Sequence, residues 1–190
     1  MSWLDALLGR TKPVKSDLDQ LFGMSTGQIT MQTELNLNPT GGAAISFRPV
    51  SSGEFARLQT EIDELMTSSS KDAALKWHSF TDTYGYRWTV LSCDDFSNLV
   101  ATVHMISREL QDYAFGEQLL ASVFQFQDST GRKVYWIYNY KRGAFYPFVP
   151  APNKQRDNAE ELHLQAVMGR ELHVDTDLEK WYALWGIPLD

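Results

Sequence analysis

The sequence is poor in cysteine, with Cys93 alone among its 190 residues. A single cysteine excludes a disulfide within the chain and any zinc site that needs several cysteine ligands. No stretch approaches the roughly 20 apolar residues that a membrane-spanning helix needs. The opening stretch MSWLDALLGRTKPVK places apolar residues before basic ones, which is the reverse of a secretory signal peptide. These features predict a cytoplasmic protein.

Motifs for cofactor and metal binding are also lacking. The chain has neither a P-loop nor the glycine pattern of a Rossmann fold. Cys93 has no base at a useful spacing, so we interpret it as a small buried hydrophobe. The histidines are scattered and lack the HExxH spacing of a zinc protease; they are His78, His104, His163 and His173. We therefore expect no catalytic residue, no metal and no cofactor, and a function other than catalysis.

The charge of the chain is unevenly distributed. Its formal net charge is −7, yet no acidic residue lies between Asp128 and Asp157. That stretch holds six basic residues, so the remainder carries 11 bases and 24 acids, a balance of −13. A basic segment on an acidic body attracts anionic partners, although lysines that protect an exposed strand edge give the same pattern. The six bases are Arg132, Lys133, Lys141, Arg142, Lys154 and Arg156.

Capping residues and helical periodicity predict a series of helices. We expect the second helix to end in the serine-rich residues 67–70, and the last to stop at Gly186. The expected starts are, in order, Ser16, a capping box of Ser51 with Glu54, Asp94 or Asp95, a box of Asp157 with Glu160, and Thr176 with Glu179. In the last helix, one face would carry Leu178, Trp181, Tyr182 and Trp185.

Strands are expected between these helices. Residues 29–37 and 43–47 flank the turn signal NPTGG, which predicts that they pair. Residues 121–127 and 133–140 are joined by DSTGR, a strong hairpin signal, and 133–140 are bulky on both faces, as in a central strand. Two further strands are expected, one through Tyr86, Trp88 and Val90 and one at 144–149.

The predicted fold is α+β, an antiparallel β-sheet with helices packed on it. We expect residues 1–15 to form an N-terminal amphipathic segment and residues 16–190 a single domain. The order of elements recurs loosely in the two halves of the chain. Two loosely related α+β halves are therefore an alternative, with a subdivision near 67–76 or at 94.

The stretch YNYKRGAFYPF, residues 138–148, combines aromatic rings with an adjacent pair of bases. Aromatics between bases on a sheet can stack nucleic-acid bases. However, strand alternation sends about half of these rings, and Trp136 before them, into the core, and the RNA-binding signature is missing. Lys141 and Arg142 fall at a turn, where their charge is available to a partner. The candidate partner-binding residues are Lys141, Arg142, Phe145, Tyr146 and Arg156.

The N-terminal residues offer a secondary contact with a partner or an anionic membrane surface. One apolar face over two helical turns is formed by Trp3, Leu4, Leu7 and Leu8, and three bases follow it. So short a face anchors only weakly.

Several stretches, taken together and in order, resemble one known family. They are LDALLGRTKPVK at the start, FGEQLL, YKRGAFYPF, RDNAEEL and the closing WGIP, and they span almost the whole chain. They resemble the PspAB family of phage-shock-protein-A-associated proteins. The resemblance implies a cytoplasmic accessory of the envelope-stress response, at the inner face of the membrane, acting with a PspA-type coiled-coil protein. It implies no catalytic residues.

Our leading hypothesis is a non-enzymatic interaction protein that docks on a PspA-type partner through the basic turn. The alternative is a small-ligand or catalytic domain with a pocket between residues 139–148 and 156–163. A concave pocket that gathers Lys141, Arg156, Asp157 and Glu160 would favour this alternative, and a flat surface would favour docking. A weak nucleic-acid binder is the third hypothesis.

Overall fold

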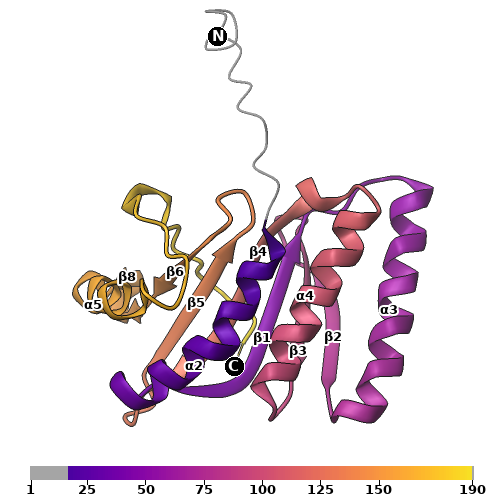
Figure 1. The fold of residues 1–190 in the computed structure, drawn as a ribbon. Helices are drawn as coiled ribbons and strands as arrows, with labels where there is room; N and C mark the ends of the chain where they lie inside the picture. The colour runs from indigo at the N-terminus through magenta and orange to yellow at the C-terminus, as the bar shows by residue number, and fades with distance from the viewer. Residues whose placement is uncertain (1–16, 190) are drawn as a thin grey trace, which may run out of the picture.

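The computed structural model describes residues 17–189, apart from the side chains of residues 70–73. Six strands form one antiparallel sheet in the order β2-β3-β1-β4-β5-β6 (Figure 1). The strands are β1 (Asn38–Phe47), β2 (Lys76–Thr81), β3 (Arg87–Ser92), β4 (Leu119–Gln127), β5 (Lys133–Asn139) and β6 (Ala144–Phe148). A small second sheet pairs β7 (Pro150–Ala151) with β8 (Gln155–Arg156). The predicted α+β fold with an antiparallel sheet is confirmed.

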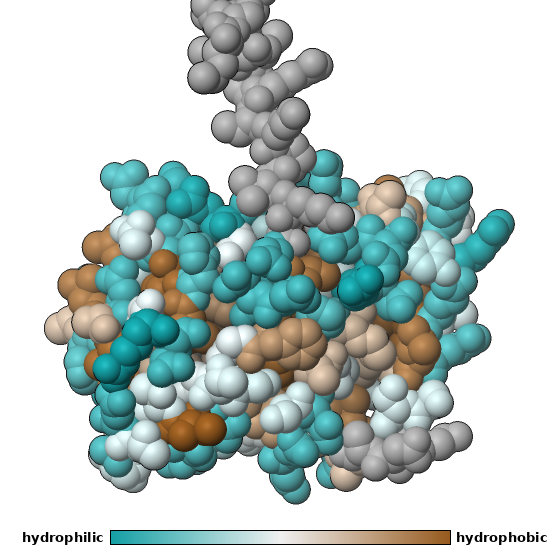
Figure 2. Space-filling view, in the orientation of Figure 1, coloured by the Kyte–Doolittle hydropathy of each residue, from teal (hydrophilic) through white to brown (hydrophobic). Residues whose placement is uncertain are grey.

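Three helices cover one face of the six-stranded sheet, and a fourth lies beyond β6 (Figure 1). The covering helices are α2 (Gly23–Glu34), α3 (Gly53–Ala73) and α4 (Phe96–Asp112), and the fourth is α5 (Asn158–Met168). Short 3-10 helices complete the chain: η1 (Leu18–Phe22), η2 (Gly116–Gln118), η3 (Pro152–Lys154) and η4 (Leu178–Lys180). Seen from the helix side, hydrophobic side chains form scattered patches among hydrophilic ones (Figure 2). No helix within residues 17–189 is long and apolar enough to cross a membrane.

The helices begin where side-chain caps satisfy their first backbone N–H groups. Asp95 accepts hydrogen bonds from the N–H groups of Ser97 and Asn98 at the start of α4, and Asp157 accepts from Glu160 N–H at the start of α5. Both of these caps were expected from the sequence. At α3 the cap is Ser52, one residue later than predicted. Each cap satisfies donors that helix geometry leaves without a partner.

Strand alternation divides the side chains of β5 between two hydrophobic layers. Trp136 and Tyr138 lie fully buried on the helix side, while Tyr135 and Ile137 lie in the layer on the opposite face. The strand is therefore an interior one, flanked by β4 and β6, as its bulky sequence predicted. Trp136 is a core residue, and this prediction is confirmed.

The face opposite the helices is covered by residues 173–189, here called the C-terminal strap. Its buried side chains, Trp181 and Leu189, pack in one cluster with Val123 and Phe148. The helix predicted from Thr176 is wrong, because only the short η4 forms. Side chains of the domain bond the strap carbonyls instead: Tyr146 Oη donates to Tyr182 O over 3.0 Å, and a guanidinium donates to Trp181 O.

Three further predictions in the first half of the chain are wrong. Residues 29–37 do not form a strand, because α2 continues to Glu34 and buries Met24, Gly27 and Met31. The NPTGG stretch is not a hairpin turn but the first half of β1, where a register shift opposite β4 falls between Pro39 and Ala43. The serine-rich residues 67–70 do not end α3, which continues to Ala73. Tertiary packing overrides local turn and strand preferences at these sites.

Candidate partner-docking surface

The turn between β5 and β6 presents the predicted pair of bases. Asn139 closes this turn, since its carbonyl accepts hydrogen bonds from Arg142 N–H (3.0 Å) and Gly143 N–H (2.8 Å), and its side chain accepts from Lys141 N–H (3.1 Å). Gly143 has a positive φ of 62°, which suits glycine. The turn is thus fixed by backbone bonds, and it leaves the Lys141 side chain exposed.

Arg142 is engaged within the protein. Its Nε and Nη2 donate to the Asp175 carboxylate over 2.8 and 3.1 Å, a two-pronged pair that joins the turn to the strap. The Asp175 side chain is buried, and the hydrogen bond from Arg142 lowers the pKa of Asp175. The same hydrogen bond raises the pKa of Arg142. A buried carboxylate needs such a partner, so Arg142 holds the strap in place.

Arg156 is likewise committed, in this case to Glu161. Its Nε donates to both Glu161 carboxylate oxygens over 3.0 and 3.1 Å, and its guanidinium lies over the Phe148 ring, 5.4 Å from the centroid. Glu161 is buried and also accepts a hydrogen bond from Val149 N–H (2.9 Å). Arg156 further donates to the carbonyl of Trp181. This residue therefore stabilises the fold from inside.

The basic run that dominates the sequence between Asp128 and Asp157 is largely neutralised in space. Arg132 pairs with Asp128 (3.1 Å), Asp157 (3.2 Å) and Glu160 (3.4 Å), and Lys133 Nζ donates to a strap carbonyl (3.2 Å). Among the six bases, ion pairs within residues 17–189 are absent only for Lys133, Lys141 and Lys154. The acids that balance this run lie outside it in the sequence.

The two aromatic candidates need a correction, because both rings are buried. Phe145 is 0% exposed and packs on Tyr138 with ring centroids 4.9 Å apart. Tyr146 is 2% exposed, and its ring stacks on Trp181 at 6.3 Å. Burial raises the pKa of Tyr146. Neither ring can contact a partner directly, since alternation along β6 places one in each hydrophobic layer.

Apolar side chains of the strap are exposed in their place. Leu178 is 49%, Tyr182 55% and Trp185 41% exposed. Tyr182 lies near enough to Arg142 to add, after Asp175, to the raised pKa of Arg142, and the Trp185 ring lies edge-on against Phe148 with the centroids 5.1 Å apart. Tyr182 thus lies near the turn before β6 and Trp185 lies at the end of β6, and large apolar residues gathered on a surface mark interaction sites. We call Lys141, Arg142, Leu178, Tyr182 and Trp185 the strap patch.

Sequence reasoning identified the two bases of the strap patch but missed its three apolar members as part of a site, although it singled them out as one face of a helix. The extended strap splits that group differently: Trp181 turns into the core, and Leu178, Tyr182 and Trp185 turn outward. The feature of the sequence that could have indicated this site is the high density of large apolar residues between 178 and 187. The secondary contact predicted at Trp3, Leu7 and Leu8 lies outside the described residues.

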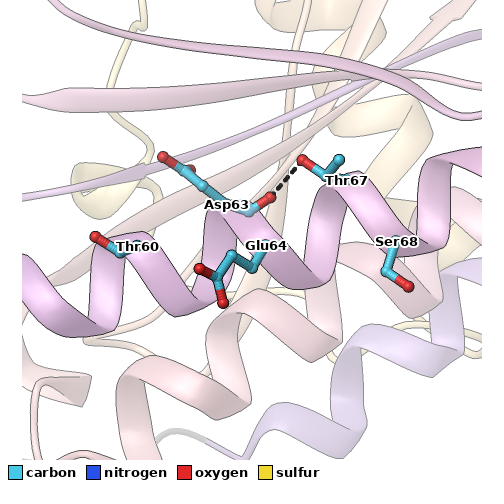
Figure 3. A pocket seen from close by; sticks show the side chains of 5 residues that line it. All are labelled: Thr60, Asp63, Glu64, Thr67 and Ser68. Atoms are coloured by element: carbon cyan, nitrogen blue, oxygen red, sulfur yellow. Dashed lines mark hydrogen bonds between the residues drawn. The ribbon is translucent and has the colours of Figure 1, made fainter.

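The residues of the predicted ligand pocket do not converge. Lys141 lies on the exposed turn, Arg156 bonds Glu161, and Asp157 and Glu160 both face Arg132. Two shallow hollows lie elsewhere, one along α3 and one between η1 and α4. The lining side chains of the first all come from α3 and point in different directions (Figure 3). In residues 17–189, no three His, Cys, Asp or Glu side chains group as metal ligands would.

The stretch GMSTG, residues 23–27, matches G-x-S-x-G, the pattern around the nucleophilic serine of α/β-hydrolases. The hydrolase motif places its serine on a sharp turn between a strand and a helix. Here the motif follows η1 and lies within α2. A Cβ on Gly27 would lie 3.1 Å from Met168 Cε, so this glycine lets α2 approach α5. The motif therefore serves helix packing.

Comparisons with known proteins give one match. The family model described as PspA associated protein B matches residues 1–189. No match was found among curated proteins or among solved structures.

Proposed function

Because the chain belongs to the PspA associated protein B family, we propose that it is a non-enzymatic accessory protein of the envelope-stress response that docks on PspA through the strap patch. The family description supplies the association with PspA. The observation that carries the proposed surface is the exposure of Leu178, Tyr182 and Trp185 on the strap, with Tyr182 near Arg142 of the basic turn. Lys141 and Arg142 remain predicted contacts, now at the rim of an apolar centre.

The composition of the strap patch suits a protein interface. Aromatic residues and arginine are over-represented among the side chains that dominate binding energy. Burying a fully exposed Leu side chain contributes roughly 1.5–3 kcal/mol, so half-exposed Leu178 can contribute about half of that. Exposed Lys141 adds little affinity but attracts carboxylates on the partner and speeds association. The partner surface that fits is apolar and edged with acidic side chains.

The strap is also held in one position before binding. Asp175 is tied to Arg142, Trp181 Nε1 donates to Asp175 O over 3.1 Å, and Tyr182 O accepts from Tyr146. Ordering a loop during association costs free energy, which a fixed segment avoids. The absence of convergence among the pocket candidates further supports docking over ligand binding or catalysis. Transient contact of Trp3, Leu7 and Leu8 with an anionic membrane remains a secondary part of the proposal.

The test is binding of purified protein to PspA from the same genome, measured by biolayer interferometry. The double variant Leu178→Ser with Tyr182→Ser should weaken binding at least about tenfold, which corresponds to roughly 1.4 kcal/mol. Ile29 is exposed on α2, on the helix side of the sheet, so Ile29→Ser is the matched apolar control and should bind normally. Likewise Lys141→Glu should slow association, whereas Lys154→Glu should not. Equal binding by the double variant and the Ile29 control would refute the strap patch.

A further inference from the structure

The outer edge of β2 carries backbone groups that no strand satisfies in the part of the chain that the structure describes. β2 pairs with β3 alone, in an unbroken register from Lys76 with Ser92 to Thr81 with Arg87. The next residue, Asp82, donates its N–H to Tyr86 O over 2.9 Å. In antiparallel strands the backbone groups of alternate residues point to the same neighbour. Even-numbered residues of β2 therefore face β3, and Trp77, Ser79 and Thr81 point their N–H and C=O groups outward.

This edge has few of the features that prevent edge-to-edge pairing. Proteins protect an edge strand with proline, a bulge, inward-pointing charges or a covering segment. β2 has the sequence KWHSFT, without proline, and its register shows no bulge. Its side chains on the face opposite the helices include exposed His78 and Phe80, which stack with ring centroids 6.1 Å apart. The strand is open along its edge and apolar on part of one face.

We propose that a second copy of this chain pairs with β2 across a two-fold axis at Ser79, so that the two sheets join into one. In this register Lys76 lies opposite Asp82 of the second copy, which places opposite charges together at both ends of the pairing. His78 lies opposite Phe80 of the second copy, which extends the ring stack across the axis. Opposite charges and aromatic pairs are the cross-strand neighbours that stabilise antiparallel strands. A two-fold interface requires such self-complementarity.

The backbone selects the same register. With the axis at Ser79, all three outward residues find a partner in the second copy. Ser79 pairs with Ser79 of the second copy, Trp77 with its Thr81, and Thr81 with its Trp77. With the axis at His78, Lys76 falls opposite Phe80, and Thr81 falls opposite Leu75, which precedes the strand. With the axis at Phe80, Trp77 falls opposite residue 83, which lies in the turn after β2. Ser79 is therefore the centre that uses the most hydrogen-bonding groups.

The neighbouring helix α3 is in contact with β2, so the side chains on its outer side bear on this pairing. Glu61 of α3 accepts a hydrogen bond from Tyr113, which follows α4, so the side of α3 that carries Thr60 and Thr67 faces away from α4. These short side chains line the hollow along α3 (Figure 3). Asp63 on the same side is paired with Arg87 of β3 at 3.8 Å, which offsets its charge. This side of α3 thus carries short side chains together with Asp63, which is paired, and Glu64.

A cysteine on the axis tests the proposal directly. The Cα atoms of a hydrogen-bonded pair lie about 5.5 Å apart, a separation that a disulfide spans. Ser79→Cys should form a covalent dimer under mild oxidation, and native Cys93 is buried and should not react. Lys76→Cys is the control, because its opposite residue is Asp82 and not another cysteine. Light scattering of the wild-type chain should give twice the 21.7 kDa of the monomer.

Ser79→Pro provides a second test, because the backbone N–H that it removes points outward and the backbone hydrogen bonds of β2 with β3 are kept. It also removes the side-chain hydrogen bond of Ser79 with Thr89 of β3 (2.8 Å). This variant should be monomeric and should melt within a few degrees of the wild type. A monomeric wild type at about 100 μM, or equal crosslinking of the Ser79→Cys and Lys76→Cys variants, would overturn the proposal. β2 and β6 lie at opposite edges of the sheet (Figure 1), and the strap patch lies on the β6 side. A monomeric wild type would therefore not change the PspA-binding difference expected between the Leu178/Tyr182 variant and its control.

Discussion

The two edges of the sheet are finished in different ways. Along β6, Phe145 forms a parallel bridge with Val174 of the strap, accepts a hydrogen bond from Asp175 N–H and donates one to His173 O, each 2.8 Å long. Along β2, no residue between 17 and 189 pairs outward. The chain thus closes one edge with its own C-terminal residues and leaves the other available. The strap covers the β6 edge and forms its surface, whereas the β2 edge is available for pairing with a further strand.

Polar contacts follow the same division. Near β6, buried Glu161 and Asp175 each hold an arginine, and strap carbonyls accept hydrogen bonds from side chains beneath them. Near β2, Ser79 bonds Thr89 (2.8 Å), Trp88 Nε1 donates to Asp82 (3.0 Å), and the exposed His78 and Phe80 stack on each other. Buried polar groups must be paired, so the closed edge is specified by many interdependent contacts. Substitutions should therefore cost more stability at β5 and β6 than at β2.

The largest expected effect is on the closed side, at Trp136. Trp136→Ala should lower the free energy of unfolding by about 3–5 kcal/mol, because the side chain is fully buried and leaves a cavity. Trp88→Ala is the matched change near the open edge, and it should cost less because Trp88 is only half-buried. Urea unfolding followed by circular dichroism measures both. If Trp136→Ala and Trp88→Ala lowered the free energy of unfolding equally, the closed and open sides of the sheet would not differ in stability as we expect.

An intermediate effect is expected at Asp175 and depends on pH. The hydrogen bond from Arg142 places the pKa of Asp175 below its ordinary value of 3.8. The pair therefore stabilises the fold fully above the unfolded-state pKa, and this contribution is lost as the pH falls through the lower folded-state pKa. We expect NMR resonances of residues 176–189 to shift as the pH falls below about 4.

The Asp175→Asn variant should lack this acid-dependent change. Asp112→Asn is its control, since Asp112 forms an exposed pair with Arg108 within α4 at 3.3 Å, and exposed pairs contribute little. If Asp175→Asn kept the wild-type acid profile, the strap would be held by contacts other than this ion pair.

The smallest expected effect on stability is at the open edge. Phe80→Ser should lower the free energy of unfolding by about 1 kcal/mol, well below the cost at Trp136, because the ring is 37% exposed. The same change should weaken self-association, since it removes the cross-axis ring contact. Thermal melting at low protein concentration separates the first effect from the second. A large loss of stability in the monomer would show that Phe80 supports the domain itself.

Sequence patterns predicted the elements whose signals are local. The caps Asp95 and Asp157, the DSTGR hairpin and strands β4, β5 and β6 need only neighbouring residues, and all were found. Helix α2 could not be predicted in this way, since GMSTGQITMQTE holds two glycines and three threonines, which favour helix weakly. Its helical form depends on burial of Met24 and Met31 beneath other elements.

The candidate site was harder to predict than the fold. The basic run is visible in the sequence, but the acids that neutralise it, such as Asp175 and Glu161, lie beyond its ends. The strap has helical spacing of Leu178, Trp181, Tyr182 and Trp185, yet the open sheet face beside it offers more apolar burial to an extended chain. Charge balance and strap conformation are both set by long-range contacts, which spacing alone does not reveal.

The central claim is that the closed edge of the sheet receives PspA while the open edge does not. Hydrogen exchange of the wild-type chain, with and without saturating PspA, tests it most directly. We predict slower exchange in residues 176–186 and at the β5–β6 turn when PspA is added, with no change in β2. Protection of β2 and α3 by PspA, with residues 176–186 unchanged, would contradict the account.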